Sequence, residues 1–157
     1  MLHFAYASNM DRAAMRRRCP GARLVGGAVL RDHRFIITRD GYASVAAARG
    51  SEVHGLVWRL TPRDLVALNA YENIDGGLYR AASPPVQAGS RAVRALVYVG
   101  RSGIPGRPRL GYMELVVAAA RDAGLPADYI ADLERIWDTP SRSAVAPNGE
   151  RYGQRRA

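Results

Sequence analysis

The pattern of apolar and polar positions along the chain predicts a mixture of strands and helices. Segments rich in β-branched and aromatic residues, bounded by glycine, proline or polar turns, predict strands at 2–7, 23–38, 43–48, 52–60, 78–80 and 92–99. In segment 52–60 apolar residues fill both sets of alternating positions. That pattern is typical of a strand buried on both faces, as in a closed or strongly curved sheet.

Capping signals predict where the helices begin. Ser8 and Asp11 have the spacing of a capping box, which predicts a short helix that ends at Arg18. Thr61-Pro62-Arg63-Asp64 is the clearest helix start, because it combines a capping hydroxyl, a proline at the first helical position and a carboxylate three residues after the threonine. Two further helices are expected at about 110–123 and 127–138.

The helix that starts at Thr61 is expected to carry Glu72 at its C-terminal end. The partial negative charge of the last helical carbonyls would raise the pKa of a carboxylate there. A sharp turn must follow from Asn73 to Gly77, with Gly76 and Gly77 free to take positive φ. Taken alone, a glutamate at a helix end is more often a solvated surface residue than a base.

Length and composition favour one domain. The chain has 157 residues, 48% of them hydrophobic, which is enough to bury a core of its own. We expect a domain over residues 1–138 and a C-terminal tail over 139–157, rich in proline, serine and arginine. No apolar run approaches the ~20 residues of a membrane span, and a signal peptide is not recognisable, so a cytoplasmic location is expected.

Cysteine and histidine are too sparse for a disulfide framework or a zinc site. Cys19 is the single cysteine, and His3, His33 and His54 are scattered along the chain. We therefore expect no bound metal. Cys19 is expected to be a buried or half-buried helix residue.

All 23 basic residues are arginine, against 14 acidic residues, and the net charge is +9. Such a charge could favour nucleic acid, an acidic protein partner or an anionic substrate. The arginines are spread along the chain, and aromatic residues do not alternate with them as a base-stacking surface requires. Nucleic-acid binding is therefore a minor hypothesis, and Arg16-Arg17-Arg18 is predicted to be a solvated helix face.

Four segments together carry a family resemblance. They are Phe4-Ala5-Tyr6-Ala7-Ser8-Asn9-Met10, Glu52-Val53-His54-Gly55-Leu56-Val57-Trp58, Tyr71-Glu72 with Gly77-Leu78-Tyr79, and Pro108-Arg109-Leu110-Gly111-Tyr112 with Ala123-Gly124-Leu125-Pro126. The first is similar to the Tyr-Gly-Ser-Asn-Leu/Met signature of the γ-glutamylcyclotransferase family, and the others resemble that family's later motifs in the same order. The resemblance covers about residues 3–135.

The resemblance implies an α+β fold, a small mixed β-barrel with flanking helices. It also implies an enzyme of the carbon–nitrogen lyase or acyltransferase type that needs no cofactor. A γ-glutamyl compound would fold back so that its α-amine attacks its own γ-carbonyl, releasing 5-oxoproline and a free amine or amino acid. Because proximity already favours ring closure, the protein would bend the substrate, remove a proton from the ammonium and stabilise the oxyanion.

Site residues follow from the same resemblance. Glu72 corresponds to the catalytic glutamate, which would take a proton from the substrate ammonium and deliver it to the leaving amine. Backbone N–H groups of the turn after the first strand would hold the substrate, as suits a strand that runs into a helix N-terminus. The implied substrate-binding residues are Tyr6, Ala7, Ser8, Asn9 and Met10 in this turn, with Tyr79 and Tyr112 lining the site.

Two departures from the family pattern leave the substrate open. Ala7 stands where glycine is usual, and its methyl group would be unfavourable if that position needs positive φ. Asn73 stands where a small residue usually follows the glutamate. The leaving group would lie against loops such as 39–51 and 100–110, and removal of a γ-glutamyl protecting group from a biosynthetic intermediate is a variant of the same chemistry.

Two alternatives from other classes stay open. One is a non-catalytic member of the same fold that binds a small ligand, for which an exposed Glu72 with no pocket beside Ser8 would argue. The other is a basic module that binds protein or nucleic acid, whose binding would weaken steeply as salt rises. Related enzymes often dimerise, so a homodimer is also expected.

Overall fold

The computed structural model of the chain describes residues 1–138. The tail predicted over 139–157 lies outside the described residues. The elements, in order, are β1 (Leu2–Ala5), a 3₁₀ segment (Ser8–Met10), α1 (Arg12–Arg18), β2 (Arg23–Ile37), β3 (Ala43–Arg59), α2 (Pro62–Tyr71), β4 (Tyr79–Ala82), β5 (Pro85–Ala88), β6 (Arg91–Arg94), β7 (Val97–Gly100), α3 (Tyr112–Asp122) and α4 (Ala127–Asp138).

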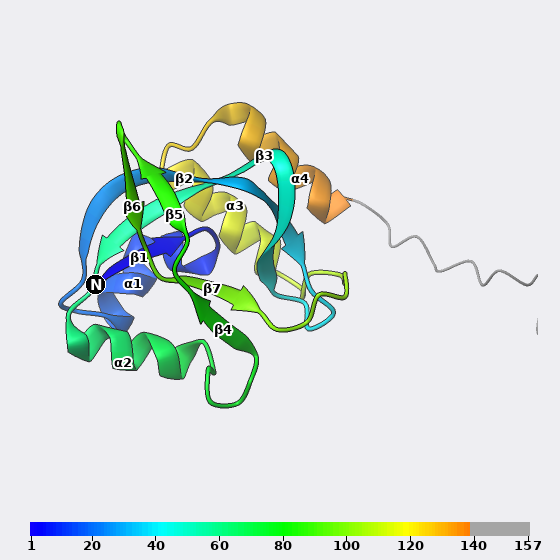
Figure 1. The fold of residues 1–157 in the computed structure, drawn as a ribbon. Helices are drawn as coiled ribbons and strands as arrows, with labels where there is room; N and C mark the ends of the chain where they lie inside the picture. Colours follow the sequence, from blue (N-terminus) through cyan, green and yellow to red (C-terminus); the bar gives the residue numbers. More distant parts are fainter. Residues whose placement is uncertain (139–157) are drawn as a thin grey trace, which may run out of the picture.

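The strands form two sheets. Five strands pair in the order β1-β3-β2-β5-β6, and β4 pairs with β7 in a sheet of their own. The long strands β2 and β3 are antiparallel, with register shifts between Leu24 and Gly26 and between Arg31 and His33 that allow the pair to bend. Figure 1 shows both as curved ribbons that arch over α3. The predicted α+β class is confirmed, although the described strands do not close into a complete barrel.

The two sheets meet where β1 lies beside the start of β7. The N–H of Phe4 donates to the carbonyl of Leu96 at 2.9 Å, and the N–H of Leu96 donates to the carbonyl of Leu2 at 2.8 Å. On its other side β1 pairs with β3. A Cβ at Gly55 would lie 2.2 Å from the carbonyl oxygen of Ala5, so this close approach of β3 to β1 requires glycine.

Several strand boundaries differ from those expected. The predicted strand 92–99 is divided into β6 and β7, which belong to different sheets, because Ala95 and Leu96 leave the β5–β6 hairpin and Leu96 bonds to β1 instead. β5 was not predicted. The predicted segments 43–48 and 52–60 are one continuous strand, β3. As expected, its end is buried on both faces, since Leu56, Val57 and Trp58 are consecutive and buried.

The predicted capping box at Ser8 and Asp11 is wrong. Ser8 begins the 3₁₀ segment instead, and the residue before it makes no side-chain cap. Asp11 is itself the N-cap of α1, and its Oδ1 accepts from the N–H groups of Ala13 and Ala14 at 2.8 and 3.0 Å. Asp11 therefore starts a second, separate helical segment rather than completing the first.

The start predicted for α2 is confirmed. The hydroxyl of Thr61 accepts from the N–H of Asp64 at 3.2 Å, and the Asp64 carboxylate accepts from the N–H of Thr61 at 3.0 Å. Asp64 is only 3% exposed, and its other oxygen accepts from the N–H of Gly21 at 3.1 Å. This side chain thus ties the start of α2 to the segment after α1.

Helix α3 fixes the remaining side of the site. Its buried face consists of Met113, Val116, Val117, Ala119 and Ala120, at the spacing of three and four residues that an amphipathic helix buries. The helix packs against the 3₁₀ segment and against α4. Its first residue, Tyr112, is thereby placed beside the turn that follows β1.

We expect the Asp64→Ala variant to lose about 2 kcal/mol of unfolding free energy, because it removes a helix cap and leaves the N–H groups of Thr61 and Gly21 without their acceptor. Urea unfolding followed by circular dichroism measures this loss. Asp75→Ala is the control, since Asp75 is exposed in the turn after α2. It should stay within about 0.5 kcal/mol of the wild type. Equal stability of the two variants would contradict this account of the cap.

Candidate active site

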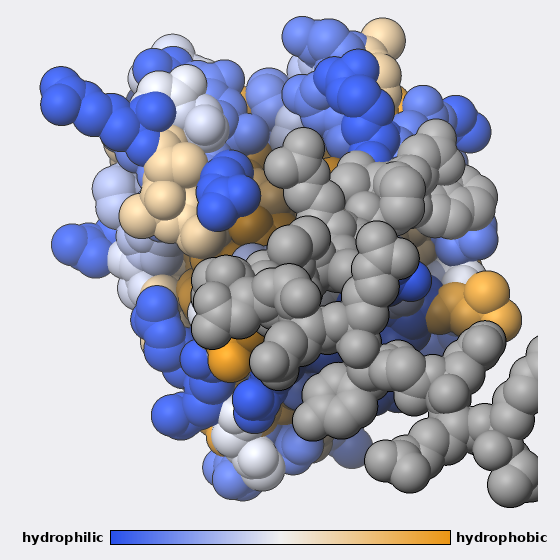
Figure 2. Space-filling model, turned by 90° about the vertical axis from the view of Figure 1, so that its right-hand side faces the viewer, coloured by the Kyte–Doolittle hydropathy of each residue, from blue (hydrophilic) through white to orange (hydrophobic). Residues whose placement is uncertain are grey.

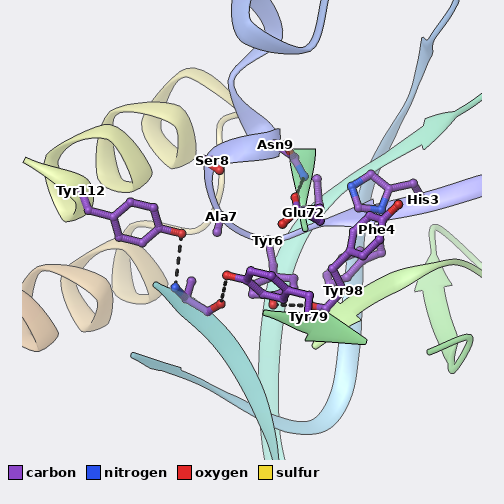
Figure 3. A pocket seen from close by; sticks show the side chains of 12 residues that line it. His3, Phe4, Tyr6, Ala7, Ser8, Asn9, Glu72, Tyr79, Tyr98 and Tyr112 are labelled. Atoms are coloured by element: carbon purple, nitrogen blue, oxygen red, sulfur yellow. Dashed lines mark hydrogen bonds between the residues drawn. The ribbon is translucent and has the colours of Figure 1, made fainter. Parts of the chain in front are cut away.

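A cavity of about 30 Å³, here called the inner cavity, lies where β1, its following turn, the end of α2 and α3 meet. It is lined by His3, Phe4, Ala5, Tyr6, Ala7, Ser8, Asn9, Ala43, Glu72, Tyr79, Tyr98 and Tyr112. Figure 3 shows these side chains converging from opposite sides, with Glu72 near the centre and Tyr112 and His3 at the two ends. The structure therefore brings most of the predicted site residues to one place.

Glu72 is held at the end of α2. Its backbone N–H donates to the carbonyl of Leu68 at 2.9 Å, which completes the last helical turn. Its side chain is 8% exposed, and Oε1 accepts a hydrogen bond of 2.6 Å from the side-chain amide of Asn9. Positive φ was expected at Gly76 and Gly77 in the following turn. The structure has it at Asn73 and Gly77 instead. Asparagine is among the residues that tolerate this conformation.

Burial raises the pKa of the Glu72 carboxyl above its ordinary value. The hydrogen bond from Asn9 and the positive charge of Arg18 act in the opposite direction. The raised pKa expected from sequence is therefore present, and burial is its largest cause. A carboxylate that is buried yet still able to ionise suits a group that accepts and returns a proton.

Arg18 takes part in the site, contrary to the solvated face predicted for Arg16-Arg17-Arg18. Arg16 and Arg17 are exposed, whereas Arg18 is half-buried. Its Nη1 donates to the side-chain oxygen of Asn9, and its guanidinium carbon lies 3.3 Å from the ring centroid of Tyr71. Since Asn9 donates in turn to Glu72, the three side chains form one chain of hydrogen bonds.

The predicted binding turn divides into residues that face the inner cavity and one that does not. Ala7 has φ of −137°, so its methyl group fits without the strain that positive φ would bring. Ser8 and Asn9 line the cavity. Met10 is 1% exposed in the core and is not among the lining residues, and its N–H donates to the carbonyl of Ala7 at 2.9 Å.

Three tyrosines frame the cavity through hydrogen bonds to the main chain. The hydroxyl of Tyr6 donates to the carbonyl of Tyr98 at 2.5 Å, and that of Tyr79 donates to the carbonyl of Ala43 at 2.7 Å. The hydroxyl of Tyr112 instead accepts from the N–H of Ala43 at 3.3 Å. Tyr112 therefore keeps its own proton for another acceptor. Burial raises the pKa of all three hydroxyls, so they are neutral.

His3 is a lining residue that the sequence did not single out. It is 2% exposed, and its Nδ1 lies 3.0 Å from the carbonyl oxygen of Leu96, which assigns the ring proton to Nδ1. Its Nε2 is buried and has no hydrogen-bond partner among the described residues. Burial lowers the pKa of His3 to about 4, so the ring is neutral at neutral pH. A lone histidine in an apolar strand gave no motif by which this could have been predicted.

Neither a metal cluster nor a membrane span is found in the described part of the chain. Over residues 1–138 no three His, Cys, Asp or Glu side chains are grouped so that they could hold a metal ion. None of the helices in that range has the length and apolar character that crossing a bilayer requires.

Comparison with known proteins defines the class. The sequence matches the model of the AIG2-like family over residues 52–133, just over half of the chain. It is 26% identical to the protein named γ-glutamylcyclotransferase in Homo sapiens over 148 residues, which cover 86% of this chain and 78% of the human protein. The Bos taurus protein of the same name is also 26% identical, with 92% and 83% covered.

The chain therefore belongs to the AIG2-like family, and its resemblance to γ-glutamylcyclotransferases is confirmed by these relatives. Solved structures agree on the fold. One described as a γ-glutamyl cyclotransferase has a TM-score of 0.78 and 23% identity, covering 98% of this chain and 92% of its own. The protein YkqA of Bacillus subtilis has a TM-score of 0.76 and 23% identity, with 88% of this chain and 54% of that one covered.

The buried histidine makes folding sensitive to acid. A folded pKa of about 4 lies below the ordinary value of 6.5, so the unfolded chain binds a proton more readily between these two values. His3 should therefore reduce stability by up to about 3 kcal/mol as the pH falls from 6.5 towards 4. We expect His3→Phe to remove this part of the pH dependence, measured by urea unfolding at several pH values.

His33→Gln is the matched control, because it removes a histidine from the β2–β3 hairpin outside the core. If the unfolding free energies of wild type and His3→Phe depend on pH in the same way, His3 does not stay neutral in the folded protein. Comparing slopes rather than absolute stabilities allows for any loss that the substitution itself causes.

Proposed function

We propose that this protein is an enzyme of the γ-glutamylcyclotransferase type, which converts a γ-glutamyl amide into 5-oxoproline and a free amine or amino acid. The observation that carries the proposal is the buried carboxylate of Glu72, bonded to Asn9 within the turn after β1. Two curated relatives over most of the chain's length bear the name of this activity.

In this reaction Glu72 moves protons between two nitrogens. The substrate α-ammonium gives up one proton to Glu72, and the resulting amine attacks the γ-carbonyl carbon. The carbon–nitrogen bond to the leaving group then breaks as the oxyanion collapses. Overall the attacking nitrogen loses two protons as it becomes the ring amide, and the leaving nitrogen gains two as it departs as an ammonium ion, with Glu72 carrying them one at a time.

The raised pKa of Glu72 fits this exchange, because a carboxyl that both takes and returns a proton works best with a pKa closer to the working pH. The turn from Tyr6 to Asn9 is proposed to hold the substrate through backbone N–H groups. Tyr112 is proposed to direct its hydroxyl proton at a substrate oxygen, since its oxygen already accepts from Ala43. Tyr79, whose proton is committed to Ala43, is proposed to shape the wall.

The two alternative functions receive less support. A binding protein without turnover was expected to leave Glu72 exposed with no pocket beside Ser8, but Glu72 is 8% exposed and Ser8 lines the inner cavity. A nucleic-acid module needs a continuous basic surface. Figure 2 shows one face, on which hydrophilic side chains border apolar ones, and the relatives found by sequence bear the name of an enzyme.

A cytoplasmic location and a homodimer stay predictions. Cys19 is a buried free thiol, which is compatible with a reducing compartment. The domain limits of 1–138 also stay a prediction.

Glu72→Gln tests the proposal most directly. The amide has nearly the same shape but cannot carry a proton, so we expect the release of 5-oxoproline from γ-glutamyl amino acids to fall by at least about 10³-fold. Mass spectrometry measures the release, and calorimetry checks that the substrate still binds. Substantial turnover by Glu72→Gln would show that Glu72 is not the group that transfers the protons.

Asn9 and Arg18 both lower the pKa of Glu72, so their loss should raise it further. We expect Asn9→Ala, which removes a hydrogen bond to the carboxylate, and Arg18→Met, which removes a nearby positive charge, each to move the acid limb of the kcat/KM profile to higher pH. Arg17→Met, exposed on the same helix, should leave the limb in place. If the acid limb of Asn9→Ala stays in place or moves to lower pH, Asn9 does not lower the pKa of Glu72.

A further inference from the structure

A second cavity of about 170 Å³, here called the outer cavity, adjoins the inner one. The two share Ser8, Glu72, Tyr79 and Tyr112. The residues that line only the outer cavity are Tyr42, Tyr71 and Leu78. Tyr71 is 50% exposed, so the outer cavity reaches the protein surface.

The relative sizes of the two cavities indicate which part of a substrate each can take. The inner cavity is closed at its far end by His3, Phe4 and Tyr98, all at most 2% exposed, whereas the outer cavity is larger and reaches the surface, so a released group of variable size has room only on the outer side. Glu72 must reach both the attacking and the leaving nitrogen, and it lines both cavities. The released group therefore extends from Glu72 into the outer cavity.

The walls of the outer cavity are aromatic and uncharged apart from Glu72. Tyr42 packs edge-on against Tyr112, with ring centroids 5.4 Å apart and an angle of 83° between the rings. Leu78 is half-buried beside them. Rigid ring faces of this kind bind aromatic or branched aliphatic groups by apolar contact.

Two arginines stack on tyrosines that line this cavity, although neither arginine is among the lining residues. The guanidinium carbon of Arg18 lies 3.3 Å from the ring centroid of Tyr71, and that of Arg109 lies 4.6 Å from the ring centroid of Tyr42. Each of these two rings therefore carries one of the protein's own cations. A positively charged leaving group would be repelled by the guanidinium groups stacked on Tyr42 and Tyr71, and it would pair with Glu72 in competition with the reaction.

Arg109 lies beside the outer cavity, because its guanidinium stacks on Tyr42, which lines it. It is exposed, and within residues 1–138 its guanidinium makes one hydrogen bond, from Nε to the carbonyl of Asp40 at 3.1 Å. The terminal nitrogens of a guanidinium fit a carboxylate in a two-pronged geometry. A free amino acid carries such a carboxylate next to the nitrogen that is released, whereas a simple amine does not.

We propose that the outer cavity selects γ-glutamyl amino acids whose leaving group is an aromatic or branched aliphatic amino acid with a free α-carboxylate, and that it disfavours cationic leaving groups. This inference rests on the proposed function for the direction of the substrate. Loops 39–51 and 100–110, expected from sequence to contact this end of the substrate, supply Tyr42 and Arg109.

Four compounds separate the contributions: γ-glutamylphenylalanine, γ-glutamylglycine, γ-glutamylphenethylamine and γ-glutamylputrescine. We expect kcat/KM of the wild type to be at least about 10-fold higher for the phenylalanine compound than for each of the other three. The glycine compound tests the aromatic wall, the phenethylamine compound tests the carboxylate, and the putrescine compound tests the charge. Equal values for all four, or a preference for putrescine, would overturn the proposal.

Arg109→Met is the variant that isolates the carboxylate contact. It should reduce the preference for γ-glutamylphenylalanine over γ-glutamylphenethylamine to nearly one, with the change in KM rather than kcat. Arg107→Met removes an exposed arginine from the same loop and should keep the wild-type preference. Tyr42→Ala should selectively reduce the preference over γ-glutamylglycine, and Tyr42→Leu serves if the alanine variant does not fold. A preference unchanged in Arg109→Met would exclude Arg109 from recognition.

Binding separates this inference from the proposed function. Glu72→Gln is titrated calorimetrically with the same four compounds, so that selection is measured without turnover. Tighter binding of γ-glutamylphenylalanine supports the selection even if the wild type releases no 5-oxoproline, an outcome that would reject the reaction alone. Equal affinities overturn the selection, whether or not the wild type is active.

Discussion

The hydrogen bond between Asn9 and Glu72 is the interaction on which the site depends. It joins the turn after β1 to the end of α2, 63 residues further along the chain. A buried carboxylate is unfavourable unless a partner satisfies it, and here Asn9 donates to it while accepting from Arg18. The backbone carbonyl of Asn9 also accepts from the indole N–H of Trp58 at 3.1 Å, which holds the turn against β3. Asn9 thus connects α1, α2 and β3 around the carboxylate of Glu72.

The competition between burial and hydrogen bonding sets the ionisation of Glu72. Burial favours the neutral acid, whereas Asn9 and the positive charge of Arg18 favour the carboxylate. Burial is the larger effect, so the pKa of Glu72 is raised despite these two partners. The neutral histidine at the far end of the inner cavity adds no charge to this balance. Apart from burial, the groups that act on the pKa of Glu72 lie on α1 or in the turn before it.

Local signals in the sequence were sufficient to predict much of the site. The start of α2 was predictable because its capping box lies within four consecutive residues. The position of Glu72 at the C-terminal end of this helix was predictable from the helix length. The family resemblance brought Tyr79 and Tyr112 to the same site, as observed. Arg18 could not be predicted, because its partners come from other elements. The division of 92–99 into two strands was missed for the same reason, since it depends on Leu96 bonding to β1.

The two tyrosines that hold Ala43 have a consequence for how this site can change. Tyr79 and Tyr112 bond to the carbonyl and the N–H of that residue, groups that every amino acid except proline supplies. Their orientation is thus independent of the side chain at position 43. That side chain acts on the site in another way, because Ala43 is buried and lines the inner cavity. Gly41 and Tyr42 before it are constrained by a positive φ and by packing against Tyr112, so position 43 is where a change of side chain would alter the volume of the site without turning its two tyrosines.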